Sequence, residues 1–373
     1  MKLMYLFYSL VFILLIGCDK PSTKSMGLLL SPTASDETQS AFAKVKKGVD
    51  IVFPDDHRAH NEFRHEWWYL TANLIDDEGQ ALGIQWTQFR FATSPPAAND
   101  HQAASTWQSQ QIYMAHSAVT TTVQHLAAEK WSRDQSALAG IESQPFRAYL
   151  DDWQWLSSTK DLFPATLNVK AKRFGYSLTL TTNAPYHKQG DNGFSTKSQD
   201  GKVASYYYSQ PFIKVTGEVT MDGKQHQVSG TGWIDREWSS QFLLDSQQGW
   251  DWFAIRLSNN ESLIVFQLRD SNTGKASYQH AKIMHRNGEN TIIDSEDIRL
   301  RPRAYTEIND RTYPTEWQLA IPSQKIDLVL SALNPNAKMP LTIPYWEGPI
   351  IIKGSHRAEG YMELTGYMEL TGY

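Results

Sequence analysis

The sequence contains a single cysteine, Cys18, among 373 residues. A disulfide within the chain is therefore excluded, and the fold must be stabilised by its hydrophobic core. Positive charge is also scarce, because 35 Lys and Arg residues stand against 40 Asp and Glu residues, which gives a formal net charge of −5. Surfaces that bind nucleic acids normally carry a basic excess, so we expect no nucleic acid as a partner.

Long apolar runs are absent after the N-terminus. Lys2 precedes an apolar segment over residues 4–16, which is too short for an ordinary membrane-spanning helix and ends at Cys18. The arrangement resembles a bacterial lipoprotein signal, whose cysteine is lipidated and becomes the mature N-terminus. We therefore predict a signal peptide over residues 1–17 and a lipid anchor on Cys18 at the periplasmic side of a bacterial membrane. Asp19, which follows the cysteine, favours the inner membrane.

Short apolar segments separated by turn residues fill most of the remaining chain. Residues 18–50 are rich in Ser, Thr, Lys and Pro, and we expect them to form a flexible tether. From residue 51 onward, short β-branched and aromatic runs predict an all-β fold. A connection with little apolar content over residues 183–201 predicts a division into two domains, 51–190 and 191–373.

A weak internal repeat supports two similar domains. An aromatic segment over residues 66–69, a turn and a strand ending at Arg90 recur as residues 249–253, a turn and a strand ending at Arg269. The copies lie about 180 residues apart, which is typical of duplicated domains rather than of a short-period array. A barrel of about eight strands can hold one small ligand or can be filled by its own side chains.

The C-terminus carries an identical tandem repeat, in which residues 361–366 recur as residues 367–372. The period of six is even, so both copies would present the same face in a strand. One copy is enough to complete a sheet, and we assign no role to the second.

Aromatic and charged side chains concentrate in residues 230–257. Successive side chains of a strand point to opposite faces. The odd-numbered face would carry Trp233, Asp235 and Glu237, and the even-numbered face Ile234, Arg236 and Trp238. Two interpretations fit this pattern: charged groups on the wall of an aromatic cavity, or an aromatic core that contains a buried Asp–Arg pair.

Asp235 and Glu237 are the candidate catalytic residues, because a buried carboxylic acid can have a raised pKa. The candidate ligand-binding residues are aromatic or polar side chains of the apolar strands: Trp67, Trp68, Tyr69, His116, Tyr207, Trp233, Arg236, Trp238, Trp250 and Trp252. A histidine inside an apolar strand, such as His116, is more often a core residue than a catalyst. Histidines near Glu66 do not match the spacing of a zinc-binding H-E-x-x-H motif, so we expect no metal and no cofactor.

Several motifs in order along the chain resemble one family. They are the segments 65–69, 114–118, 190–195, 205–209, 233–241, 249–252, 345–348 and 360–367. Together they are similar to the AttH-like lipocalin-type proteins, which are related to carotenoid 1,2-hydratase. The resemblance covers residues 54–373 and implies two lipocalin-like antiparallel β-barrel domains packed together. It also implies a secreted or lipid-anchored protein, in some members encoded beside components of an ABC transporter.

The hydratases related to this family add water to a terminal isoprenoid double bond. That reaction needs a strong acid in an apolar cavity and aromatic faces that stabilise a cation. The Asp-His-x-Trp motif of the hydratases is similar to residues 235–238, but Arg236 stands at the histidine position. Their Tyr-x-Asp pair falls near Phe266 and Leu268, where this chain has no acid. An arginine paired with Asp235 would also lower the pKa of that carboxyl and argue against acid catalysis.

Three functions therefore stay open. The first is a membrane-anchored lipoprotein that binds a lipid or an isoprenoid in an aromatic cavity, as an accessory to an ABC transporter. The second is a hydro-lyase of the carotenoid 1,2-hydratase type. The third is a scaffold for interaction with other proteins.

Overall fold

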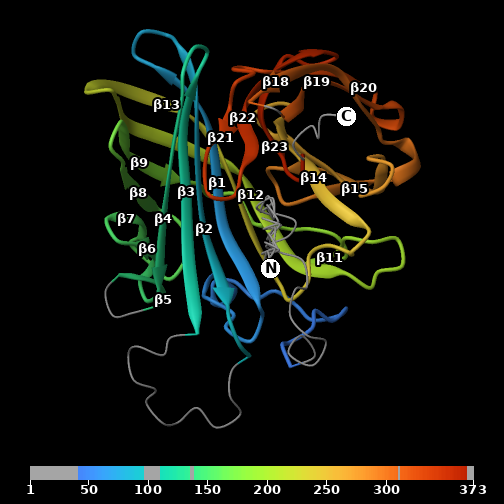
Figure 1. Cartoon of the computed structure of the whole chain (residues 1–373), viewed down its shortest axis with the longest axis horizontal. Helices are drawn as coiled ribbons and strands as arrows, with labels where there is room; N and C mark the ends of the chain where they lie inside the picture. Colours follow the sequence, from blue (N-terminus) through green and yellow to red (C-terminus); the bar gives the residue numbers. More distant parts are fainter. Residues whose placement is uncertain (1–40, 96–109, 135–137, 310, 368–373) are drawn as a thin grey trace, which may run out of the picture.

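The computed structural model describes residues 41–95, 110–134, 138–309 and 311–367 (Figure 1). The predicted signal peptide, Cys18 and most of the predicted tether lie outside the described residues. Within the described ranges the regular structure is almost entirely β-strand, as predicted, with short 3₁₀ helices η1 (Asp55–His57), η2 (Ser295–Asp297) and η3 (Pro322–Gln324). No helix in these ranges has the length and apolar character needed to cross a bilayer.

The first sheet is an antiparallel meander whose last long strand pairs with its first. Its strands are β1 (His65–Asp76), β2 (Ala81–Ala92), β3 (Gln111–Thr121), β4 (His125–Arg133), β5 (Ala139–Ser143), β6 (Phe146–Leu150), β7 (Trp153–Ser157), β8 (Ala165–Lys170), β9 (Phe174–Thr181), β10 (His187–Lys188), β11 (Phe194–Thr196), β12 (Ala204–Met221) and β13 (Lys224–Ser239). The order is β4-β3-β2-β1-β13-β12-β9-β8-β7-β6-β5, and β10 and β11 pair with β12. The sheet therefore curls into a near-closed barrel that is open between β4 and β5.

The second sheet repeats this arrangement. Its strands are β14 (Gln247–Arg256), β15 (Glu261–Asp270), β16 (Ala276–His285), β17 (Asn290–Ile293), β18 (Arg299–Ile308), β19 (Arg311–Ile321), β20 (Ile326–Ala332), β21 (Lys338–Met339), β22 (Tyr345–Gly354) and β23 (Ala358–Leu364). The order is β17-β16-β15-β14-β23-β22-β20-β19-β18, and β21 pairs with β22. Again the last strand pairs with the first, and the opening lies between β17 and β18. The two copies of the predicted repeat are the equivalent hairpins β1–β2 and β14–β15.

The division between the sheets does not coincide with the predicted division at residues 190 and 191. Strands β12 and β13 pair with β9 and β1, so they belong to the first sheet, and the change of sheet occurs between Ser239 and Gln247. The polar segment that suggested a linker contains the short strands β10 and β11, which lie along β12. The low apolar content of residues 183–201 therefore belongs to a segment whose short strands pair with β12, and not to a domain boundary.

Each sheet encloses a core of its own, and the two sheets lie side by side (Figure 1). In β1, Trp68 and Leu70 face the core of the first sheet, whereas Tyr69 belongs to a separate cluster shared with the second sheet. The interior of the first sheet is filled with side chains, because the cavity beside Trp86 measures only about 10 Å³. Among the described residues around Trp86, the first sheet therefore leaves no room for a ligand.

Candidate functional site

A cavity of about 70 Å³ lies between the two sheets. One water molecule needs about 10–15 Å³ on this scale, so the cavity has room for several waters or for the end of an apolar molecule. Aromatic side chains from both sheets form much of its wall: Trp67, Tyr69, Phe89, Tyr207, Trp250, Trp252 and Phe266. The remaining lining residues are Thr87, Lys197, Asp235, Glu237, Phe242, Leu268 and Glu363.

Strand pairing brings the polar groups of the first sheet together. Tyr69 lies opposite Asp235 in the pairing of β1 with β13, and Trp67 lies opposite Glu237. On the other side of β13, Tyr207 of β12 lies opposite Glu237. Side chains opposite each other in an antiparallel pair point to the same face. Asp235 and Glu237 therefore face the cavity together, in agreement with the predicted alternation of side chains along β13.

Asp235 is a buried carboxyl group with several hydrogen-bond donors around it. It accepts hydrogen bonds from Tyr207 Oη (2.6 Å), from Trp233 Nε1 (2.9 Å) and from Ser209 Oγ. Burial raises the pKa of Asp235 to about 7, and the charge of Glu237 adds to this, although the three donors act in the opposite direction. A carboxyl with this pKa is partly protonated at neutral pH and can act as a general acid.

Glu363 of β23 brings a second carboxyl group to the cavity from the other sheet. It is half-buried and accepts a hydrogen bond from Trp250 Nε1 at 3.1 Å. Burial raises the pKa of Glu363 to about 7, and the charges of Asp235 and Glu237 contribute to the increase. The two carboxyls therefore both titrate near neutral pH, and the charge of Asp235 contributes to the raised pKa of Glu363.

Glu237 differs from Asp235 and Glu363 because it forms an ion pair with Lys197. Its carboxylate lies 2.6 Å from Lys197 Nζ and accepts a hydrogen bond from Ser205. The ammonium group also lies 4.9 Å from the ring centroid of Tyr207 and 4.7 Å from that of Phe266. Such contacts with aromatic faces stabilise a desolvated cation. This ion pair keeps a fixed dipole at the wall of an otherwise mostly apolar cavity.

Arg236 lies on the opposite face of β13 and takes no part in the cavity wall. Its guanidinium lies 2.5 Å from Glu66 and 3.7 Å from the ring centroid of Trp68. It also lies 5.1 Å from the ring centroid of Trp238. The arginine is therefore paired away from Asp235, and the objection that it would lower the pKa of that carboxyl does not apply.

The structure separates the predicted site residues into two groups. Those that line the cavity are Asp235, Glu237, Trp67, Tyr69, Tyr207, Trp250 and Trp252. Trp233 lies behind this wall, where it hydrogen-bonds Asp235 and packs edge-on against Trp252. Trp68 and Trp238 belong to the core of the first sheet, Arg236 packs against both rings, and none of the three lines this cavity. His116 is fully buried and pairs with Tyr345 Oη at 3.0 Å, which fits a core histidine.

Glu363, Lys197 and Phe242 line the cavity but were not predicted from the sequence. Glu363 belongs to the first copy of the C-terminal tandem repeat, and its strand lies between β14 and β22. The alternation of Met362, Glu363 and Leu364 predicts a strand with one polar face. This local pattern does not indicate that Glu363 faces residues of the first sheet across the cavity. Phe266 and Leu268, where the hydratase pattern suggested an acid, instead form apolar wall.

The sequence matches one protein family, and the structure is similar to two solved structures. The sequence profile of the AttH-like family matches residues 44–367. A crystal structure of a protein from Nitrosomonas europaea described as an AttH has 30% sequence identity and a TM-score of 0.78, covering 88% of this chain and 100% of that one. Kievitone hydratase from Nectria haematococca has 14% identity and a TM-score of 0.62, covering 89% and 97%. No curated protein matches the sequence significantly.

Proposed function

Because this chain belongs to the AttH-like family, we propose that it is a hydratase-type enzyme that acts on an apolar unsaturated molecule, such as an isoprenoid. The end of the substrate would occupy the cavity between the sheets. The observation that carries the proposal is Asp235, a buried carboxyl with a pKa near 7 that faces an aromatic wall. Hydration of an alkene requires an acid that remains protonated near neutral pH and can reach carbon.

The proposed reaction uses two carboxyl groups. Asp235 donates its proton to one carbon of the double bond, and the π electrons form the new C–H bond. The resulting cation lies against aromatic faces, such as those of Tyr207 and Trp252, which stabilise positive charge. The oxygen of a water molecule then bonds to the cationic carbon, and its released proton passes to the carboxylate of Glu363. Return of that proton to Asp235 completes the cycle, and the reverse sequence is dehydration.

The Lys197–Glu237 pair would have a positioning role beside this reaction. Glu237 already forms an ion pair with the ammonium group of Lys197 at 2.6 Å, so its carboxylate is engaged there. We therefore assign the acid role to Asp235, and we assign to Glu237 the task of holding Lys197 and orienting water. Kievitone hydratase, which is a hydratase of similar fold, supports the reaction class at the level of fold only.

The test is turnover in ¹⁸O-labelled water with a panel of terminal isoprenoids and prenylated aromatic compounds. Mass spectrometry should detect a product that contains one added H₂¹⁸O. Asp235→Asn and Glu363→Gln should each lower the rate by about 10²-fold or more, because each removes a proton-transfer group. Asp222→Asn, a change in an exposed pair with Arg173, serves as the control and should be fully active. Equal rates in the wild type and in Asp235→Asn would refute the proposed acid.

A second candidate is binding without chemistry, and the mostly aromatic wall of the cavity favours it. In this case the lipoprotein, anchored through Cys18, would hold a lipid or isoprenoid at the membrane for an ABC transporter. Native mass spectrometry of protein extracted from membranes should then reveal a bound apolar molecule. Asp235→Asn would retain this molecule, whereas it would lose turnover under the first proposal. The two functions are thus distinguished by one variant.

A further inference from the structure

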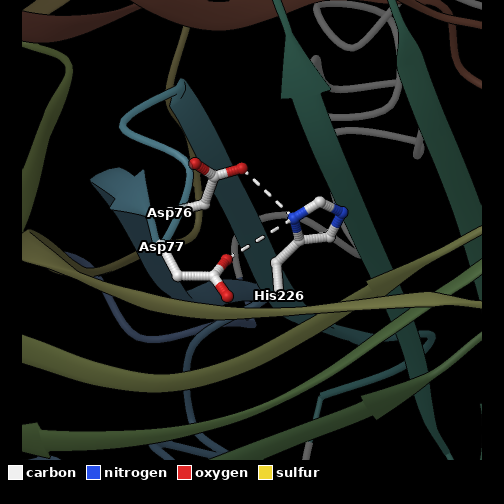
Figure 2. Close-up of side chains that lie close together, drawn as sticks. All are labelled: Asp76, Asp77 and His226. Carbon is white, nitrogen blue, oxygen red and sulfur yellow. Dashed lines mark ion pairs between the residues drawn. The ribbon is translucent and has the colours of Figure 1, made fainter.

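Three metal-ligating side chains converge at the far end of β1 from the cavity. Asp76 ends β1, Asp77 follows it in the turn to β2, and His226 lies near the start of β13 (Figure 2). Figure 2 shows the imidazole pointing between the two carboxylates. Asp76 is nine residues along β1 from Trp67, or about 30 Å, so this group is separate from the cavity.

We propose that Asp76, Asp77 and His226 form a binding site for a divalent transition-metal ion such as Zn²⁺. His226 Nδ1 lies 3.2 Å from Asp76 Oδ2 and 3.8 Å from Asp77 Oδ1. The potential ligand atoms all lie within 4.8 Å of one another. Ligand atoms at about 2.0–2.1 Å from a tetrahedral zinc ion are separated by about 3.3 Å. A small inward movement of the exposed Asp77 would therefore complete this geometry.

A buried imidazole nitrogen without a hydrogen bond is the second observation that points to a ligand. His226 is 7% exposed, and its buried Nδ1 makes no hydrogen bond; its contacts are the ion pairs with the two carboxylates. Buried polar atoms in folded proteins are nearly always paired, so an unpaired one requires an explanation. Coordination to a metal ion would occupy this lone pair.

The surroundings of Asp76 leave one oxygen free for a cation. Its Oδ1 accepts hydrogen bonds from the backbone N–H groups of Glu78 (3.0 Å) and Gln80 (2.7 Å), which fix the carboxylate in the turn. Its Oδ2 then points to His226. Hydrogen bonds of this kind orient metal ligands and reduce the cost of assembling the site. Asp77 is exposed, so water molecules can complete the coordination sphere.

The charge and the chemistry of the donors indicate the kind of ion. Two carboxylates and a neutral imidazole carry a charge of −2, and the nearby Lys224 is engaged with Glu78 at 2.6 Å. One imidazole and two carboxylates suit Zn²⁺ and similar first-row ions better than Ca²⁺ or Mg²⁺, which prefer oxygen ligands alone. A bound ion would tie the β1–β2 turn to the start of β13 and so fix two neighbouring hairpin ends.

The test is a calorimetric titration of the purified full-length protein, carrying no histidine tag, with Zn²⁺. The wild type should bind one equivalent, and Asp77→Asn and His226→Gln should each weaken this binding at least about tenfold. Zn²⁺ should also raise the melting temperature of the wild type more than that of either variant. Asp77 is exposed, so Asp77→Asn should fold even if the buried His226 variant does not.

Two further variants control for adventitious binding. His285 lies 3.4 Å from Glu261 and outside the cluster of Asp76, Asp77 and His226, so His285→Gln should bind Zn²⁺ as the wild type does. Lys224→Gln removes a positive charge near the site and should strengthen binding. The proposal is overturned if the wild type binds no Zn²⁺, or if Asp77→Asn binds it as tightly as the wild type, since His226 and Asp76 would then form an ion pair alone.

Discussion

Nη2 of Arg236 lies 2.5 Å from Oε2 of Glu66, and neither side chain is exposed to solvent. Arg90 pairs with the other oxygen of the same carboxylate, and Nδ1 of His60 lies 3.3 Å from Oε2. Burial alone would raise the pKa of Glu66, but the charges of Arg90 and Arg236 outweigh it and hold that pKa well below its usual value. This network fastens β1 to β2 and β13 on the face that points away from the cavity.

Glu66→Gln should therefore destabilise the protein strongly. The change leaves two buried guanidinium groups without their counter-charge, and breaking a buried pair in this way costs about 3–5 kcal/mol. Chemical denaturation followed by tryptophan fluorescence should show the loss as a lower midpoint. Asp222→Asn breaks an exposed pair and should leave the midpoint nearly unchanged. Similar midpoints for the two variants would mean that the Glu66 network contributes little.

The raised pKa values of Asp235 and Glu363 predict a pH dependence of stability. Each group has a pKa near 7 in the folded protein and an ordinary value of 3.8 or 4.5. Between these values the folded state binds more protons than the unfolded state, so the free energy of unfolding falls as the pH rises towards 7. The slope is at most about 1.4 kcal/mol per pH unit for each group.

Buried histidines change the free energy of unfolding with pH in the opposite direction. The contribution of Asp235 must therefore be obtained by comparing the wild type with a variant that lacks this carboxyl. Burial lowers the pKa of His116 and His125 to about 4 and that of His280 to about 3, which costs stability as the pH falls below about 6.5. The difference in the free energy of unfolding between the wild type and Asp235→Asn should isolate the contribution of this carboxyl. The free energy of unfolding of the wild type, relative to that of the variant, should be higher at pH 5 than at pH 8. A difference that is constant over this range would contradict a raised pKa.

How far the sequence could predict the site is clearest in β13. Alternation along residues 233–238 assigned Trp233, Asp235 and Glu237 to one face and Arg236 to the other, and the structure agrees. Alternation says which residues share a face, but it does not say what covers that face. Trp68 and Trp238 were expected at the site because aromatic character is the same in a core and in a cavity wall. Only the packing of the two sheets distinguishes them.

Long-range pairing accounts for the other differences. Glu363 reaches the cavity because β23 pairs with β14, and this brings it opposite Trp252. Lys197 reaches Glu237 because β11 pairs with β12. Both contacts join segments distant in sequence, and no local pattern encodes them. The all-β fold and the duplicated hairpin, in contrast, depend on local periodicity and were predicted.

Filling the cavity should abolish ligand binding without removing any polar group. Leu268 lines the 70 Å³ cavity, so Leu268→Trp would place an indole in the space of the ligand. We expect the loss of binding of a neutral apolar dye, N-phenyl-1-naphthylamine, in a fluorescence titration, with a stability cost of about 1–3 kcal/mol from overpacking. Ile351→Trp, at a residue 45% exposed, should bind the dye like the wild type. Binding that survives Leu268→Trp would place the ligand elsewhere.

Lipidation at Cys18 remains a prediction from the sequence and has a direct test. In a bacterial host the protein should incorporate labelled palmitate and sediment with the inner membrane. Cys18→Ser should abolish labelling and release the protein from the membrane fraction, because the substitution removes the thiol that would carry the lipid. Labelling that persists in Cys18→Ser would exclude this anchor, since no other cysteine is present.

The last strand of the described residues, β23, lies between β14 and β22 rather than at an edge. A polypeptide still in synthesis has its first sheet, Asp235 included, long before this strand exists. Until residues 358–364 arrive, the second sheet has no link between its two halves and the cavity has no Glu363. In the proposed reaction, a product terminated before residue 358 would therefore lack the second proton carrier and would be inactive.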